Sequence, residues 1–494
     1  MNTPDKINPL KLAEPALLRQ QAYIEGAWVD SADKQAFAVH NPATGEVIAQ
    51  VANLDGAGAE RALAAADAAL PAWRAKTGKE RTGLMRKWFD LLIAHQDDLA
   101  ALMTAEQGKP LAEARGEVVY GASFIEWFAE EAKRVSGDIM ASPWTDRRMV
   151  MIRQPIGVCI SITSWNFPIA MITRKCAPAI AAGCTIVIKP AEQTPLCALA
   201  MAELAERAGI PKGVINIITA DAERSIAVGK VLCASPIGRH LSFTGSTPVG
   251  RILMQQCAPT VKKVGLELGG HAPFIVFEDA DIDAAVEGAI ASKYRNAGQT
   301  CVCTNRFYVH DKVYDEFSAK FAAASQKIAV GSGFNKGVTQ GPLIDEAALA
   351  KVEQHVSDAI TKGAKLTAGG KRHSLGGTFY EPTVLTDTKP DMLVMYEETF
   401  GPVAAIARFT DEAEVIKLAN ASEFGLASYF YSRDIGRVWR VAEALDYGMV
   451  GINTGLISNE VAPFGGMKQS GLGREGSKYG IDEYLEMKYL CMGL

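Results

Sequence analysis

From Met149 onward, short runs rich in β-branched residues alternate with alanine-rich runs of helical length. This alternation is typical of βαβ units, whose strands assemble into a parallel sheet. The β-rich runs are residues 158–163, 185–188, 213–218 and 240–243, and the helical runs are residues 169–182, 197–208 and 249–257. A second block, from residue 272 to about 440, has strand candidates at 274–277, 307–310 and 403–409. We therefore predict an α/β protein.

The ends of the chain add further elements. Residues 22–28 predict a hairpin, and residues 57–75 and 79–107 predict two helical stretches. Near the C-terminus, residues 484–490 have strand-forming character after a turn at Gly480. The 494 residues suggest about three domain-sized units.

Composition narrows the class of protein. Hydrophobic residues make up 48% and charged residues 22%, as in soluble globular proteins, and the net charge of −5 argues against a nucleic-acid partner. Residues 1–6 show no signal or transit peptide, and no run is long enough to span a bilayer, so we expect a cytoplasmic protein with no membrane partner. The nine scattered cysteines indicate reduced thiols and no structural metal.

Cys301 lies in a turn of small residues, 296–306, between a helical run at 283–294 and a β-type run at 306–309. A thiol at such a joint is partly exposed near backbone N–H groups, which we expect to lower its pKa and to stabilise charge on the group that it attacks. Cys301 is therefore a candidate nucleophile. The alternative is a buried structural cysteine.

Two other segments carry candidate catalytic groups. Glu267 lies between two leucines before paired glycines, and its apolar flanks should raise its pKa enough for it to act as a general base. The alternative for Glu267 is a salt-bridged core residue. Asn166 lies between two aromatic residues after a predicted strand, where its amide can donate to an oxyanion, the alternative being an Asx turn before proline.

Together these segments resemble the aldehyde dehydrogenase superfamily, in which the base precedes the nucleophile by the 34 residues that separate Glu267 from Cys301. The resemblance runs from about Tyr23 to the C-terminus, through segments 243–247, 398–402 and 463–466. Within the superfamily, segments 298–303 and 455–460 are similar to those of succinate-semialdehyde dehydrogenases and their glutarate-semialdehyde relatives.

This resemblance implies a Rossmann-type parallel-sheet cofactor domain, an α/β catalytic domain and a small oligomerisation arm. Residues 1–133 and 154–265 would form the NAD-binding domain, residues 266–465 the catalytic domain, and residues 134–153 and 480–494 the arm. In the family the terminal strand pairs with another subunit, so a homodimer or homotetramer is expected. The alternative is a loosely docked tail.

One G-x-G-x-x-G motif occurs, at 471–476, but we reject it as the dinucleotide site. It lies near the C-terminus, with no clear strand before it and no room for a βαβ unit. The better phosphate site follows the strand at 240–243, where Gly245 and Ser246 lead into a helix with Pro248 in its first turn. The alternative reading of this segment is ordinary helix capping.

A second strand end carries Lys189 and Glu192, which by the resemblance flank the adenosine ribose. The carboxylate of Glu192 accepts from both ribose hydroxyls and repels a 2′-phosphate, which favours NAD over NADP, although Lys189 weakens this inference. Segment 220–224 departs from the family because it is more charged than the glycine-bearing stretch of relatives. The other expected cofactor contacts are Thr163, Ser164, Trp165 and, by resemblance at the nicotinamide ribose and ring, Glu398 and Phe400.

The resemblance also implies a reaction sequence. The thiolate of Cys301 adds to an aldehyde while its own N–H and the Asn166 amide stabilise the oxyanion, hydride passes to the nicotinamide, and a thioester remains. Glu267 then activates water to hydrolyse the thioester. Lys175 and Glu475 would relay protons.

Arg174 and Arg295 resemble the carboxylate clamp of the subfamily, and Ser458 adds a hydroxyl donor. Arginine suits this role because its planar guanidinium binds a carboxylate bidentately. The clamp favours succinate semialdehyde, but glutarate semialdehyde stays open, since one methylene changes discrimination by only ~1–3 kcal/mol. Structural salt bridges are the alternative role for each arginine.

Cys303, two residues after Cys301, suggests a strained, easily reduced disulfide and hence reversible oxidative inactivation. An inert packing thiol is the alternative. Two other functions fit part of the pattern: a catalytically silent NAD-binding scaffold, and a thiol esterase whose turnover needs no cofactor.

Overall fold

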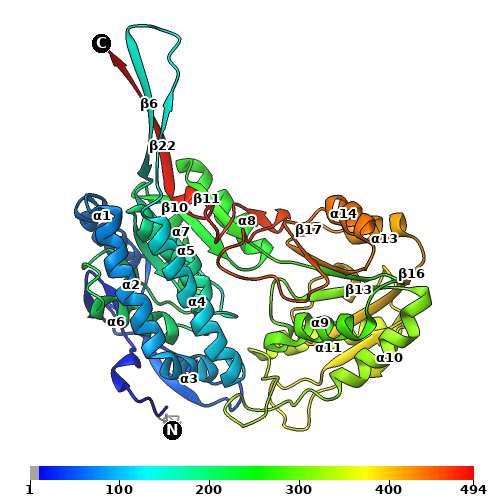
Figure 1. Ribbon diagram of the computed structural model, residues 1–494. Coiled ribbons are helices and arrows are strands. Elements are labelled where there is room, and N and C mark those ends of the chain that lie inside the picture. Colours follow the sequence, from blue (N-terminus) through cyan, green and yellow to red (C-terminus); the bar gives the residue numbers. More distant parts are fainter. Residues whose placement is uncertain (1–9) are drawn as a thin grey trace, which may run out of the picture.

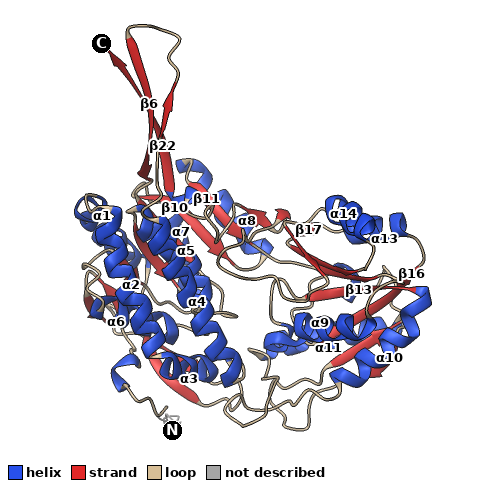
Figure 2. Cartoon of the chain, in the orientation of Figure 1, coloured by secondary structure: helices blue, strands red, loops and turns tan. Residues whose placement is uncertain are grey.

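The computed structural model describes residues 10–494. Two large sheets lie in separate lobes, and a narrow arm projects from the lobe that contains the N-terminal half of the chain (Figures 1 and 2). The leader at residues 1–6, and with it the start of the expected cofactor domain at residues 1–9, lies outside the described residues.

The first sheet has eight strands in the order β2-β1-β9-β8-β7-β10-β11-β21. Its five central strands are parallel, which confirms the predicted βαβ pattern. They are β7 (Val158–Ile162), β8 (Thr185–Lys189), β9 (Ile215–Ile217), β10 (Gly238–Thr244) and β11 (Lys263–Glu267), with antiparallel strands β1 (Ala22–Ile24), β2 (Ala27–Val29) and β21 (Gly471–Leu472). The strand order reverses between β7 and β10, and open α/β sheets bind ligands at the carboxyl ends of strands at such a switch point.

Helices cover both faces of this sheet. Its connecting helices are α5 (Ala170–Ala182), α6 (Leu196–Arg207), α7 (Ala222–Ala234) and α8 (Thr247–Cys257), and the preceding helices are α1 (Gly56–Arg74), α2 (Gly78–Ala94), α3 (Gln96–Gln107) and α4 (Leu111–Glu131). The single helical stretch expected at 79–107 was wrong, because the chain breaks at His95 between α2 and α3. Helices α4 and α7 were not predicted from the sequence.

The second sheet has seven strands in the order β14-β15-β16-β13-β12-β18-β19, parallel except at the β14 edge. Its strands are β12 (Ala272–Val276), β13 (Thr304–His310), β14 (Lys365–Ala368), β15 (Thr383–Thr386), β16 (Val403–Phe409), β18 (Ala427–Tyr431) and β19 (Met449–Ile452). Helices α9 (Ile282–Tyr294), α10 (Tyr314–Ser325), α11 (Glu346–Thr361), α12 (Leu393–Tyr396), α13 (Glu412–Asn420) and α14 (Ile435–Ala444) accompany it. All three strands predicted in this block are present.

The arm is a three-stranded antiparallel sheet in the order β22-β6-β5 (Figure 1). It consists of β22 (Leu485–Gly493), β6 (Arg147–Pro155) and β5 (Asp138–Met140), which confirms the predicted C-terminal strand. Most of β22 is exposed, including Met487 at 74%. Smaller pairs are β3 (Ala36–His40) with β4 (Val47–Ala52) and β17 (Phe424–Gly425) with β20 (Met467–Lys468). No helix between residues 10 and 494 is long and apolar enough to cross a membrane.

Candidate active site

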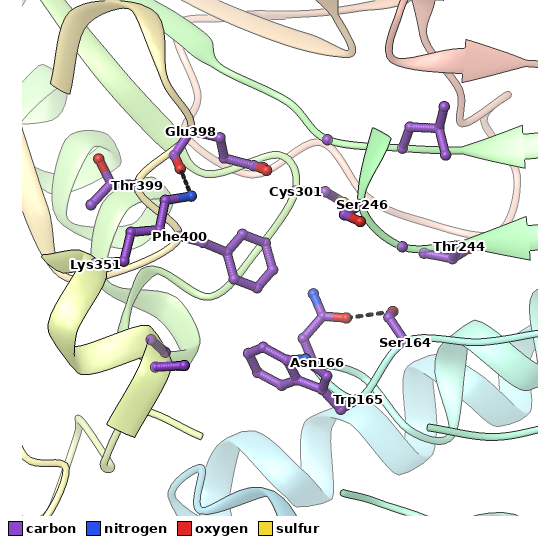
Figure 3. A pocket seen from close by; sticks show the side chains of 15 residues that line it. Ser164, Trp165, Asn166, Thr244, Ser246, Cys301, Lys351, Glu398, Thr399 and Phe400 are labelled. Carbon is purple, nitrogen blue, oxygen red and sulfur yellow. Dashed lines mark hydrogen bonds between the residues drawn. The ribbon is translucent and has the colours of Figure 1, made fainter. Parts of the chain in front are cut away.

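A cavity of about 520 Å³ lies at the carboxyl ends of β7 and β10, where the strand order reverses. Its wall includes Cys301 from the second lobe, together with Ser164, Trp165, Asn166, Thr244, Gly245, Ser246, Glu398 and Phe400. Figure 3 shows Cys301, the Asn166 amide and the Phe400 ring around one hollow. Three segments that are far apart in the sequence therefore meet at the candidate nucleophile.

The turn before Cys301 has an unusual backbone. Asn296, Ala297 and Gly298 have consecutive φ values of 52°, 56° and 75°, in the left-handed region that non-glycine residues rarely adopt. A Cβ atom at Gly298 would lie 2.2 Å from the carbonyl oxygen of Gly401, and one at Gly270 would lie 2.2 Å from that of Cys301. The two glycines thus let neighbouring chain segments approach the cysteine turn and fix its position.

Asn166 connects the first lobe to this turn. Its Oδ1 accepts from the Ser164 hydroxyl at 2.8 Å, and its Nδ2 donates to the Gln299 carbonyl at 3.0 Å (Figure 3 shows the former). Neither bond is that of an Asx turn, in which the side chain binds its own backbone two residues on. The Asn166 amide therefore contacts the cysteine turn at Gln299, which precedes the nucleophile by two residues.

A buried ion pair that the sequence analysis missed supports the Asn166 loop. Lys109 Nζ lies 2.5 Å from Glu117 Oε2 and donates to the Asn166 carbonyl at 2.8 Å, and both charged side chains are 1% exposed. Glu117 Oε1 accepts from the backbone N–H groups of Ile169 and Ala170, at 3.0 and 3.2 Å, at the start of α5. Lys109 thus binds the Asn166 loop, and Glu117 binds the start of the helix that follows it. The sequence signal was the Gly108-Lys109-Pro110 turn before a helical run.

Cys301 is half-buried, but the expected lowering of its pKa was wrong. Burial raises the pKa of the thiol to about 12, and the carboxyls of Glu398 and Glu267 act in the same direction. The charges of Arg174 and Arg295 lower it by less. Desolvation of the thiolate therefore outweighs its cationic neighbours.

Glu267 lies at the end of β11, 5% exposed. Burial and the nearby carboxylate of Glu475 raise its pKa well above the usual range, in the direction expected from its apolar flanks. Its Oε2 has no hydrogen-bond partner, and among the described residues it forms no salt bridge, so the alternative of a salt-bridged core glutamate finds no support. Its side chain lines a small cavity with Arg174 and Glu475.

Lys175 and Glu475 form a buried ion pair, and Arg174 Nε lies 2.9 Å from the other carboxylate oxygen of Glu475. The Arg174 guanidinium also lies 3.7 Å from the centre of the Phe464 ring. The structural salt bridge considered for Arg174 is thus present, although its Nη2 has no hydrogen-bond partner among residues 10–494.

Arg295 differs from Arg174. Its side chain is half-buried, forms no salt bridge in the described part of the chain, and lines a small cavity with Ser458, Val302 and Tyr429. Arg295 and Ser458 therefore lie together, whereas Arg174 lies beside Glu475.

The phosphate segment borders a second cavity, of about 620 Å³. Ser246 is the N-cap residue of α8, but its side chain makes no capping hydrogen bond, and the buried Thr244 hydroxyl has no partner in the described part of the chain. Capping alone therefore does not explain these residues. The same cavity is lined by Thr163, Ser164, Trp165, Lys189, Glu192, Gly245 and by residues of α7 and α8.

Several predicted residues have specific neighbours in these cavities. Lys189 Nζ lies 3.5 Å from Glu192 Oε2. Glu398 accepts from the Gly270 N–H at 3.0 Å, and burial raises its pKa to about 7. The Phe400 ring meets Trp165 edge-on, with ring centres 5.6 Å apart.

Three further features of the sequence are the glycine motif at 471–476, the charged segment 220–224 and Cys303. In the glycine motif, β21 pairs antiparallel with β11, so no βαβ unit forms there. In the charged segment 220–224, Asp221 caps α7, and Arg224 forms an ion pair with Asp33. The Cys303 thiol is 1% exposed and contacts the carbonyls of Lys293 and Thr304 at 3.4 Å. No group of three metal-ligating side chains occurs between residues 10 and 494.

Comparison with known proteins agrees with this geometry. Residues 28–490 match the family model described as "Aldehyde dehydrogenase family". The chain is 64% identical to glutarate-semialdehyde dehydrogenase of Pseudomonas aeruginosa and 61% identical to succinate-semialdehyde dehydrogenase [NADP(+)] GabD of Escherichia coli, in each case over 98% of this chain and 100% of the relative. The crystal structure of succinate-semialdehyde dehydrogenase from Burkholderia pseudomallei superposes with a TM-score of 0.96, at 64% identity, over 98% of this chain and 100% of that one. The chain belongs to the aldehyde dehydrogenase family.

Proposed function

We propose that the protein oxidises succinate semialdehyde to succinate with a nicotinamide dinucleotide. One observation carries this proposal: the Cys301 thiol, the Asn166 amide and the groups expected at the cofactor line the same cavity. Glutarate semialdehyde is the alternative substrate, and relatives named for each aldehyde are more than 60% identical to this chain.

In the proposed reaction the Cys301 sulfur adds to the aldehyde carbon to form a thiohemiacetal. The Asn166 amide and the Cys301 N–H stabilise the oxyanion. Burial raises the pKa of the thiol, and the charges of Arg174 and Arg295 favour the thiolate that adds, so this step does not require Glu267. When bound, the nicotinamide accepts the hydride that leaves the thiohemiacetal carbon.

Glu267 then removes a proton from the water that hydrolyses the thioester. The proton passes toward the Lys175–Glu475 pair. The small cavity that Glu267 shares with Glu475 supports this route, because the unpaired Oε2 of Glu267 is buried and the Glu475 carboxylate that pairs with Lys175 lines the same cavity.

The residues present fit a dinucleotide. The uncapped start of α8 and the unpaired Thr244 hydroxyl suit the pyrophosphate, since helix N-termini bind anions. Lys189 and Glu192 would hold the adenosine ribose, and Glu398 and Phe400 the nicotinamide ribose and ring. The carboxylate of Glu192 favours NAD. A kcat/KM for NADP equal to or above that for NAD would contradict this preference.

Arg295 and Ser458 would bind the distal carboxylate of the substrate, with Arg174 on the other side. The half-buried, unpaired guanidinium of Arg295 supports this assignment. Arg174 is partly committed to Glu475, so its free Nη2 is the atom expected to contribute.

The assembly is proposed to be a homodimer or homotetramer joined through the arm at residues 134–153 and 480–494. The exposed apolar side chains of β22 support this, because β22 is the edge strand of the arm and an exposed apolar edge favours pairing with another chain. The two large sheets support a cofactor domain at 1–133 and 154–265 and a catalytic domain at 266–465. The nine unpaired cysteines favour the reducing cytoplasm.

The test is NADH formation with succinate semialdehyde and with butanal, which has the same carbon count but no carboxylate. We expect strong preference for the acid-bearing aldehyde and loss of that preference in Arg295→Ala. Arg295→Ala is a cleaner test than Arg174→Ala, because removing Arg174 also removes one of the two cations that pair with Glu475. Equal turnover of butanal by the wild type would contradict the substrate assignment.

The same assay separates the other functions. A silent scaffold would form no NADH with any aldehyde, and a thiol esterase would turn over without cofactor. If glutarate semialdehyde has the higher kcat/KM, the alternative substrate assignment is the correct one.

A further inference from the structure

Tyr120, on α4, has a buried hydroxyl without a hydrogen-bond partner in the described part of the chain. Buried hydroxyl groups are nearly always hydrogen-bonded, and an unpaired one costs free energy. A partner that is absent from the protein itself would account for it.

Two aromatic contacts place Tyr120 between the arginines of the proposed substrate site. Its ring centre lies 5.1 Å from that of Phe124, and the Arg174 guanidinium lies 5.7 Å from the Phe124 ring. Tyr120 also packs against the cluster of Phe167, Ala170 and Met171, and the Phe167 ring lies 5.2 Å from the Arg295 guanidinium. One arginine therefore lies at a ring that contacts Tyr120, and the other lies at a ring of the cluster against which Tyr120 packs.

The charges that act on the phenol are consistent with this position. The charges of Arg174 and Arg295 lower the pKa of the phenol, and Glu475 and Cys301 raise it. Burial raises the pKa of Tyr120, which keeps the hydroxyl protonated and able to donate.

We propose that the Tyr120 hydroxyl donates a hydrogen bond to the distal carboxylate of the substrate, between Arg174 and Arg295. This inference rests on the proposed function and adds a specificity residue to it. A carboxylate has about four acceptor sites, more than two guanidinium groups in these positions fill. Because α4 holds the phenol in place, the hydroxyl also fixes the distance from the carboxylate to the aldehyde carbon, and so contributes to chain-length selection.

Tyr120→Phe removes only the hydroxyl and keeps the ring. A hydrogen bond to a charged group predicts a loss of roughly ten- to hundredfold in kcat/KM for succinate semialdehyde, mostly through KM. Turnover of butanal should stay within about twofold. Discrimination between succinate and glutarate semialdehydes should also decrease. Tyr314→Phe is the matched control, because the Tyr314 hydroxyl donates to the Ile406 carbonyl in the other lobe, and we expect it to change neither substrate.

Two readouts do not depend on turnover. Succinate should protect Cys301 from iodoacetamide at lower concentration in the wild type than in Tyr120→Phe. The melting temperature of Tyr120→Phe should not fall, since the variant removes an unpaired hydroxyl.

Equal loss for both aldehydes, no loss for either, or a lowered melting temperature in Tyr120→Phe would overturn the role of Tyr120. Failure of the proposed function is distinguishable from these results, because it appears in the wild type as absent preference for the acid-bearing aldehyde.

Discussion

Replacing Lys109 by methionine should destabilise the protein strongly. The change leaves the Glu117 carboxylate buried, 1% exposed, without its counter-charge. Breaking a buried ion pair from one side costs about 3–5 kcal/mol. Glu117 would still accept from the N–H groups of Ile169 and Ala170, which places the expected cost near the lower end, about 3 kcal/mol. The variant also removes the bond from Lys109 to the Asn166 carbonyl, so kcat should fall.

Guanidinium unfolding followed by tryptophan fluorescence measures this cost. The double variant Lys109→Met, Glu117→Gln should recover more than half of the loss, because glutamine keeps the acceptor for both N–H groups and buries no charge. Arg115→Met is the surface control: Arg115 lies 2.7 Å from Asp97, with the side chains 47% and 78% exposed, and such pairs contribute at most about 1 kcal/mol. A loss for Lys109→Met no greater than that of the control would refute the reasoning.

Three further predictions concern the catalytic groups. Glu475→Gln should move the acidic limb of the kcat pH profile to lower pH. The carboxylate of Glu475 raises the pKa of Glu267, so its removal lowers that pKa and lets Glu267 act as a base at lower pH. An unmoved limb would contradict the coupling between the two carboxyl groups. The rate at which iodoacetamide alkylates Cys301 in the cofactor-free protein should rise about tenfold per pH unit through pH ~9, because the pKa of the thiol is about 12. A rate that stops rising near neutral pH would show that burial does not suppress the thiolate. If Cys303 forms a disulfide with Cys301, peroxide inactivation that dithiothreitol reverses should disappear in Cys303→Ala; its persistence would leave Cys303 as a packing thiol.

The parallel strands could be predicted from sequence because buried β-rich runs between helices have few alternative arrangements. Helix α4 was missed because Glu117 interrupts its apolar face, and only the tertiary partner Lys109 explains a charge there. The break at His95 has no glycine or proline to announce it.

At the site, the motifs identified the candidate residues, but the pKa values and ion pairs of those residues depend on the fold. The direction of the Glu267 pKa followed from its neighbours in sequence, whereas that of Cys301 depended on burial by distant segments. The pairing of Arg174 with Glu475 joins residues 301 positions apart, and the contact of Tyr120 with the Phe167 cluster joins α4 to the start of α5. No local pattern contains such information.

The central claim, that Cys301 carries the acyl group and Glu267 releases it, is tested most directly by intact-protein mass spectrometry of Glu267→Gln mixed with succinate semialdehyde and NAD. The account predicts a mass increase of one succinyl group, located on Cys301 by peptide mapping and absent from Glu267→Gln, Cys301→Ser. An unmodified Cys301 in a variant that still forms NADH at the wild-type rate would contradict it.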